Sequence, residues 1–102
     1  MNGTTDTNGA DAEVGAASAR TALQRDVGLR VRAVREQRGV GQAECARSAG
    51  VDTSSLFRLE KGGQNVTIDM LARLAVALDV GMDDLLEGIT VDPSIVELRP
   101  RV

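Results

Sequence analysis

The stretch with the most chemical information runs from Gln42 to Gly62 and reads QAECARSAGVDTSSLFRLEKG. Two short helical patterns are joined there by the tripeptide AGV at 49–51, whose glycine permits a sharp turn. Leu56 and Leu59 would anchor the second helix to a core. The residues left nearer to solvent are Thr53, Ser54, Phe57, Arg58 and Lys61. A short, polar and partly basic helix face of this kind suits the DNA major groove, which admits a helix and displays hydrogen-bonding base edges.

The sequence has few of the residues that catalytic sites and metal sites require. The chain has no histidine and a single cysteine, Cys45, which excludes the usual zinc sites, histidine-based catalysis and an internal disulfide. We expect Cys45 to be a small buried apolar group. One group of acids does not have the spacing of a calcium loop, so we interpret it as a solvated face: Asp79, Asp83, Asp84 and Glu87. We therefore expect no enzyme, no cofactor and no bound metal.

Composition and charge favour a single domain with a basic middle. The 102 residues are 42% apolar and 26% charged, and Phe57 is the only aromatic residue, so Leu, Val and Ala must build the core. The net charge is −3, but residues 19–62 carry nine basic against five acidic side chains, while both ends are acidic. No apolar stretch approaches the roughly 18 residues that a membrane span needs, and no secretory signal is visible, so we expect a cytoplasmic, nucleoid-associated protein.

Hydrophobic periodicity predicts an all-α, compact five-helix domain over residues 19–88. The first helix would start near Arg20 and end near Arg38, because Gly39 follows it. The later helices are expected at 42–49, at 53–61 with Asp52 as cap, at 68–78 with Thr67 as cap, and at about 82–86. Residues 1–18 are rich in Gly, Ala, Thr, Asn and Asp, which predicts a flexible N-terminal tail.

Residues 89–102 form a C-terminal extension with two alternatives. Asp92 followed by Pro93 is a pair that starts helices, whereas Ile89, Val91 and Ile95 prefer strands. Both conformations stay open at this point. The fifth helix and this extension together carry more apolar surface than one small domain covers, so a dimer contact is expected there: Met82, Leu85, Leu86, Ile89, Val91, Ile95 and Val96.

From Val27 to Glu87 the chain resembles the lambda-repressor-like helix-turn-helix family of the Xre and Cro type. The matching motifs are, in order, RVRAVREQRGVGQAECARSAGV, DTSSLFRLEKG, TIDMLARLAVALDV and MDDLL, and together they cover about 60 of the 102 residues. The resemblance implies a DNA-binding domain in which the helix that begins at Thr53 enters the major groove of double-stranded DNA.

The resemblance also implies roles for individual residues. Base contacts are expected from Thr53, Ser54, Phe57 and Arg58. Phosphate contacts are expected from Gln42, Ser55, Lys61, Gln64 and Asn65. Arg35 and Glu60 match a structural ion pair that bridges the first helix to the end of the recognition helix. For Thr53 and Ser54 a capping role is the alternative, and Phe57 could either touch a thymine methyl group or pack inward.

Some residues depart from the family pattern. The loop from Gly62 to Val66 has no basic residue, although relatives often grip phosphates there. Since each neutralised phosphate contributes close to one unit of salt slope, weaker and less salt-sensitive binding is expected. Gly41 and Gly81 replace frequent capping serines, and Asp79 replaces a frequent glycine.

The sequence therefore predicts a sequence-specific DNA-binding transcriptional regulator, either a repressor or an autoregulator. One such helix reads only a few base pairs, so a homodimer on a pseudo-palindromic operator is expected. No membrane association is expected. The alternative is an antitoxin or accessory protein-interaction module of the same fold, which would use its acidic C-terminal part to bind a protein partner.

Overall fold

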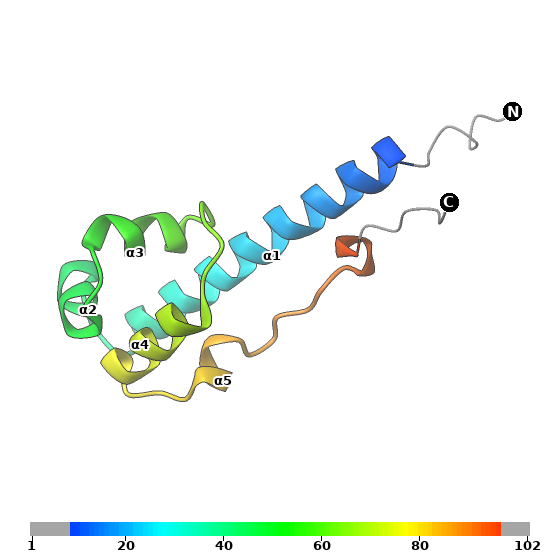
Figure 1. Ribbon diagram of the computed structural model, residues 1–102. Coiled ribbons are helices and arrows are strands. Elements are labelled where there is room, and N and C mark those ends of the chain that lie inside the picture. Colours follow the sequence, from blue (N-terminus) through cyan, green and yellow to red (C-terminus); the bar gives the residue numbers. More distant parts are fainter. Residues whose placement is uncertain (1–8, 97–102) are drawn as a thin grey trace, which may run out of the picture.

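The computed structural model describes residues 9–96, with side chains from Val14 onward, and this part of the chain is helical without strands (Figure 1). Its elements are α1 (Gly9–Gln37), α2 (Gln42–Ala49), α3 (Thr53–Glu60), α4 (Ile68–Leu78), α5 (Met82–Leu85) and the short 3₁₀ helix η2 (Pro93–Ile95). The predicted all-α fold class is confirmed. None of the helices in this range is long and apolar enough to span a bilayer.

Helix α1 is 29 residues long and projects well beyond the other helices (Figure 1). It begins at Gly9, so the expected flexible tail is wrong for residues 9–18, while residues 1–8 of that prediction lie outside the described residues. The physical reason is packing of this part of α1 against a distant segment of the chain. Ala16 in this segment and Ala19 just after it are buried, at 0% and 6% exposure, and alanine has the highest helix propensity.

The C-terminal segment packs against this part of α1 and buries one side of it. After α5 the chain turns back and runs along α1 to η2, which packs against the helix (Figure 1). The Ser94 hydroxyl donates a hydrogen bond to the Gly15 carbonyl oxygen over 3.2 Å. Asp92 caps η2, because its carboxylate accepts from the Ser94 N–H over 2.9 Å, and this bond lowers the pKa of Asp92. Residues 93–95 thus adopt a helical turn, and 97–102 lie outside the described residues.

The core is built from the helix faces that periodicity predicted. Its largest fully buried side chains come from all five α-helices: Leu56, Leu59, Leu74, Leu78, Leu85, Val31 and Cys45. Small residues on α2, among them Ala46 and Ala49, allow that helix to pack closely. Fully burying one leucine contributes about 1.5–3 kcal/mol, so these leucines dominate the stability of the domain.

The helix ends agree only in part with the expected caps. The Thr67 hydroxyl accepts from the Met70 N–H over 3.0 Å, as predicted. Asp52 occupies the N-cap position of α3 with extended backbone, but its side chain makes no capping hydrogen bond, so that prediction is wrong. Asp79 ends α4 in the left-handed conformation, with φ 57°, which explains why a glycine is the more usual residue there.

Gly28, in the middle of α1, allows α3 to approach that helix closely. A Cβ atom on Gly28 would overlap the carbonyl oxygen of Leu59 and lie 3.0 Å from that of Glu60. Gly62, with φ 75°, plays the same part just after α3, since a Cβ there would lie 2.7 Å from the Cα of Arg25. Two glycines therefore let the C-terminal end of α3 rest directly on α1.

We predict that Gly28→Ala lowers the free energy of unfolding by about 1–3 kcal/mol, because the added methyl group forces α3 away from α1. This predicted loss is opposite to the effect expected from helix propensity alone, because alanine is more favourable than glycine in a helix interior by about 1 kcal/mol. Gly15→Ala is the matched control in the same helix. A Cβ there meets only Ser94 at 3.6 Å, an ordinary contact, so this variant is expected to be neutral or stabilising. Urea denaturation compares the two variants, and equal effects would contradict the proposed close approach.

Candidate nucleic-acid interface

The turn between α2 and α3 is made by one left-handed glycine. Gly50 has φ 68° and ψ 35°, and the Val51 N–H that follows it donates to the Ala46 carbonyl oxygen over 2.9 Å. Arg73 of α4 donates from Nη1 to the Ala49 carbonyl oxygen over 3.3 Å. The end of α2 is therefore hydrogen-bonded both to the turn and to α4. These bonds fix the orientation of α3 relative to α2.

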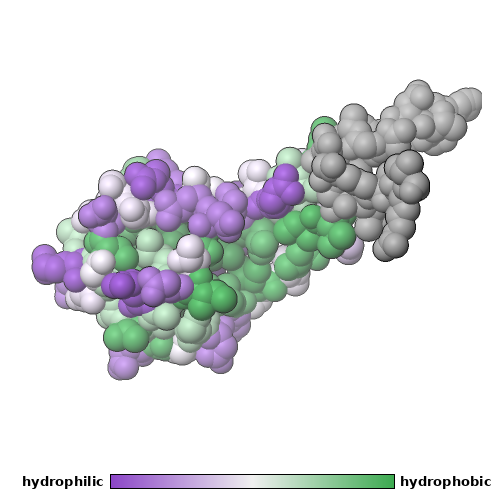
Figure 2. Space-filling view, viewed as in Figure 1, coloured by the Kyte–Doolittle hydropathy of each residue, from purple (hydrophilic) through white to green (hydrophobic). Residues whose placement is uncertain are grey.

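One side of α3 is buried and the other faces solvent. Leu56 and Leu59 are 0% and 1% exposed and enter the core. The exposed residues are Thr53, Ser54, Phe57 and Arg58 on the helix and Lys61 at its end. Figure 2 shows hydrophilic side chains gathered over α3, at the upper left of the view. The five residues that the sequence placed near solvent thus form one accessible surface, which we call the α3 face.

Phe57 points outward and takes no part in the core. Its side chain is 46% exposed, and it is absent from the buried cluster and from the residues packed against it. The Lys61 ammonium lies 4.8 Å from the centre of its ring, within the range of a cation–π contact. Of the two orientations left open by the sequence, the inward one is wrong.

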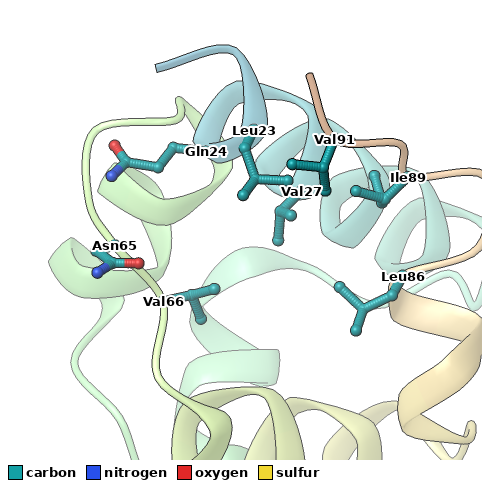
Figure 3. A pocket seen from close by; sticks show the side chains of 8 residues that line it. All are labelled: Leu23, Gln24, Val27, Asn65, Val66, Leu86, Ile89 and Val91. Atoms are coloured by element: carbon teal, nitrogen blue, oxygen red, sulfur yellow. The ribbon is translucent and has the colours of Figure 1, made fainter. Parts of the chain in front are cut away.

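The remaining polar candidates divide between α3 and the loop that follows. On α3 the Arg58 guanidinium donates from Nη2 to the Ser55 hydroxyl over 3.3 Å, so these two side chains lie together. Gln64 is half-buried in the loop. Asn65 is exposed in the same loop and lies near Gln24 of α1, at one side of an apolar pocket (Figure 3). Two of the predicted phosphate contacts, Gln64 and Asn65, thus lie in the loop and not on α3.

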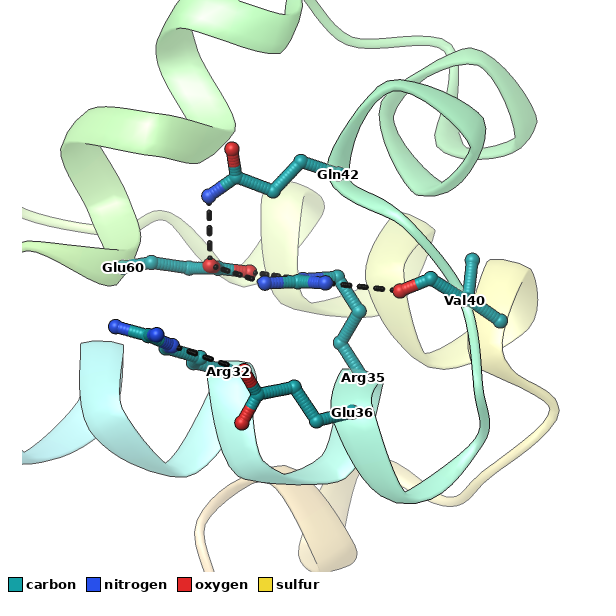
Figure 4. Close-up of polar contacts among 6 residues, drawn as sticks. All are labelled: Arg32, Arg35, Glu36, Val40, Gln42 and Glu60. Atoms are coloured by element: carbon teal, nitrogen blue, oxygen red, sulfur yellow. Dashed lines mark hydrogen bonds and ion pairs between the residues drawn. The ribbon is translucent and has the colours of Figure 1, made fainter.

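A buried ion pair connects α1 to the last residue of α3 (Figure 4). Arg35 donates from Nε to Oε2 of Glu60 over 2.7 Å and from Nη2 to Oε1 over 2.9 Å, and the two side chains are only 10% and 2% exposed. Arg35 also donates from Nη1 to the Val40 carbonyl oxygen over 2.8 Å. The hydrogen bond to Glu60 raises the pKa of Arg35 above its ordinary value, so the guanidinium stays charged.

Gln42 is the third member of this network. Its amide nitrogen donates to Oε1 of Glu60 over 2.9 Å (Figure 4). A carboxylate can only accept, so the amide nitrogen and not its oxygen must face Glu60. The sequence suggested a phosphate role for Gln42 but gave no sign of this bond, because no local pattern relates two residues on different helices. The first residue of α2 is thereby linked to the last residue of α3.

The single thiol of the chain is buried in the core. Cys45 is 0% exposed, and burial raises the pKa of its thiol despite the opposing charge of Arg35. In the described part of the chain, no group of three or more Cys, Asp or Glu residues could hold a metal ion. Two of the acids near α5 have intramolecular partners. The Asp84 carboxylate accepts from the Gly81 N–H over 2.9 Å, and Glu87 lies 3.6 Å from Arg30.

Two short helices joined by a tight turn, with one side of each in the core and the α3 face exposed, define a helix-turn-helix domain. The family model described as "Helix-turn-helix domain" matches residues 26–87, and the chain therefore belongs to the helix-turn-helix family. This is a family of DNA-binding transcriptional regulators. The matched range agrees with the span over which the sequence resembled the lambda-repressor-like type.

Solved structures of regulators share this fold. The restriction-modification controller protein C.AhdI from Aeromonas hydrophila is 32% identical, with 64% of this chain and 94% of that chain covered and a TM-score of 0.62. The clp gene regulator ClgR from Corynebacterium glutamicum is 31% identical, with 63% and 83% covered and a TM-score of 0.61. A Vibrio cholerae HTH_3 family transcriptional regulator, at 21% identity, 66% and 38% coverage and a TM-score of 0.63, shows the fold alone. No curated protein sequence gives a significant match.

We predict that Glu60→Ala lowers the free energy of unfolding by about 3–5 kcal/mol, because it leaves the Arg35 charge buried without its partner. Glu36→Ala is the matched control. Glu36 pairs with Arg32 over 3.2 Å, but both side chains are more than half exposed, so its loss is expected to cost about 0.5 kcal/mol or less. Chemical denaturation measures both. Similar losses for the two variants would show that burial adds nothing to the Arg35–Glu60 pair.

Proposed function

We propose that this chain is a sequence-specific regulator that inserts α3 into the major groove, as a repressor or autoregulator. The observation that carries the proposal is the outward α3 face on a helix whose far end is fixed to α1 by the Arg35–Glu60 pair. A rigid helix with exposed polar and basic side chains suits base recognition, because little freedom is lost on binding. C.AhdI, described as a controller protein, and ClgR, described as a gene regulator, support this function.

Each side chain of the α3 face, and four polar residues outside it, have a proposed role. Thr53, Ser54, Phe57 and Arg58 contact base edges, with the Arg58 guanidinium suited to the two acceptors of guanine. Gln42, Ser55, Lys61, Gln64 and Asn65 contact phosphates. The contact from Gln42 is compatible with its bond to Glu60, because the amide nitrogen carries a second hydrogen. Phosphate contacts position the helix, and base contacts select the sequence.

We also propose a homodimer, formed by the apolar surface between α1 and the C-terminal segment. Leu86, Val91 and Val96 are exposed there by 39%, 53% and 62%. Leu86 and Val91 line a pocket of about 350 Å³ formed mainly by apolar side chains of α1, the loop after α3 and the C-terminal segment, and Figures 2 and 3 show this apolar region and the pocket. An exposed apolar patch beside a pocket supports self-association. Two copies would read half-sites about 34–36 Å apart on a pseudo-palindromic operator.

The accessory-module alternative is less well supported. It depends on the acidic C-terminal part binding a basic partner, but several of these acids already have partners in the chain. Asp69 pairs with Arg73 over 2.8 Å and Asp79 with Arg38 over 3.4 Å. A protein partner that requires this charge would have to displace those contacts. DNA recognition by the α3 face requires no such rearrangement.

We predict that Arg58→Ala weakens operator binding by about 1–3 kcal/mol and removes the preference at one base position, because a bidentate guanine contact is lost. The measurement is fluorescence anisotropy against duplexes selected from a random library and against random duplexes, at two salt concentrations. Undetectable binding of the wild-type chain to both would overturn the DNA-binding proposal itself.

Lys61→Ala is the matched control for Arg58→Ala, because it removes one positive charge from the same face. A phosphate contact carries no sequence information, so binding should weaken for all sequences alike and the salt slope should fall by about one unit. The roles assigned to Arg58 and Lys61 would be contradicted if the two variants changed base preference equally.

We predict that Val91→Glu weakens self-association by roughly tenfold or more, because a carboxylate is costly to bury in an apolar interface. Val76→Glu is the control. Val76 is 81% exposed on α4, where it lines a groove with residues of α2 and no residue of the C-terminal segment. Sedimentation over a range of protein concentrations measures both. A monomeric wild-type chain, or equal effects of the two substitutions, would contradict the proposed dimer surface.

A further inference from the structure

Phe57 places an apolar ring on the exposed α3 face, where the ring takes no part in the core. It is the only aromatic residue of the chain, yet it lies outside the core with 46% of its surface exposed. Its neighbours on the α3 face are polar or charged: Thr53, Ser54, Arg58 and Lys61. Since nearly half of the residue's surface is exposed, apolar surface of the ring is available to a partner that approaches α3.

Lys61 limits how that partner can approach. Its ammonium lies 4.8 Å from the ring centre and so covers one face of the ring. The rest of the exposed ring surface is left for contact. Arg58, the next residue along α3, is also exposed, and consecutive side chains of a helix differ by about 100° in direction. The ring and the guanidinium therefore reach neighbouring positions on whatever surface α3 meets.

The chemistry of the major groove leaves one apolar group for the ring. Base edges there display nitrogen and oxygen acceptors and amino donors, and the apolar exception is the C5 methyl group of thymine. A methyl group at C5 of cytosine would occupy the same place on the ring. A guanidinium, in contrast, matches the two acceptors of guanine, O6 and N7.

We propose that α3 reads a 5-methylpyrimidine beside a guanine, with Phe57 contacting the C5 methyl group and Arg58 the guanine of a neighbouring base pair. This inference rests on the proposed function and specifies which base step the α3 face selects. Phe57 is then a specificity-determining residue that detects the presence of a single methyl group. Thymine and 5-methylcytosine share that group, so both are candidate sources.

The test removes the methyl group alone. Duplexes are selected with the wild-type chain from a random library, and the thymine beside the required guanine is replaced by deoxyuridine, which differs only at C5. Wild-type binding is expected to weaken about fourfold, the equivalent of one buried methyl group. Phe57→Ala should bind both duplexes equally, while Phe57→Leu should keep part of the preference. Arg58→Ala should keep the methyl preference and lose the guanine preference.

A second pair of duplexes distinguishes the two sources. The thymine pair is replaced by a cytosine–guanine pair with or without a C5 methyl group on cytosine. Tighter wild-type binding to the methylated duplex would assign the shared methyl group as the recognised feature, and equal binding would assign thymine alone. Because Phe57 is outside the core, thermal unfolding of Phe57→Ala should match the wild type.

The outcomes separate this inference from the proposed function. If the wild-type chain selects no sequence and binds no duplex, the DNA-binding function fails. If it selects a site but binds the thymine and deoxyuridine duplexes equally, the function stands and the role of Phe57 is overturned. Retention of the full preference by Phe57→Ala would also overturn it, because another residue must then detect the methyl group.

Discussion

The orientation of α3 depends on the buried contact between Arg35 and Glu60. Two charges this far from water are tolerated only when each is paired and hydrogen-bonded, and here both carboxylate oxygens and three guanidinium nitrogens have partners. The additional bond from Gln42 brings the start of α2 into the same network. Moving the end of α3 away from α1 would separate these groups in a medium of low polarity. The contact therefore fixes α3 more through the cost of breaking it than through its net contribution to stability.

The glycines of α1 and of the loop after α3 make this contact geometrically possible. Gly28 and Gly62 remove the side chains that would hold α3 away from α1, so the helix end can approach until Glu60 reaches Arg35. At the opposite end of α3, Gly50 sets the turn from α2. The helix is thus held at both ends and along its leucine side. What remains exposed is the α3 face, which is positioned without any contact of its own to the core.

Sequence patterns predicted those features that depend on neighbouring residues. The apolar spacing and the glycines placed all five α-helices, and the same spacing separated Leu56 and Leu59 from the exposed residues of α3. Features that depend on distant segments were missed. Residues 9–18 have few large apolar groups, so the sequence predicted a flexible segment. They pack instead against Ser94 and its neighbours, and Ser94 is 79 positions away from its partner Gly15. The closeness of Gly28 to Leu59 and the bond from Gln42 to Glu60 are tertiary in the same sense.

The distribution of charge explains how an acidic chain can serve as a DNA-binding domain. Arg30, Arg38 and Arg73 each contact acids or carbonyl groups of the chain itself. These contacts offset much of the acidic C-terminal part, but they also take arginines away from phosphates, and the loop from Gly62 to Val66 supplies none. Non-specific DNA binding is almost entirely electrostatic, so it should be weak here. In the proposed function, affinity would then come largely from base contacts and from the proposed dimer, which would make the ratio of specific to non-specific binding depend on the few side chains of the α3 face.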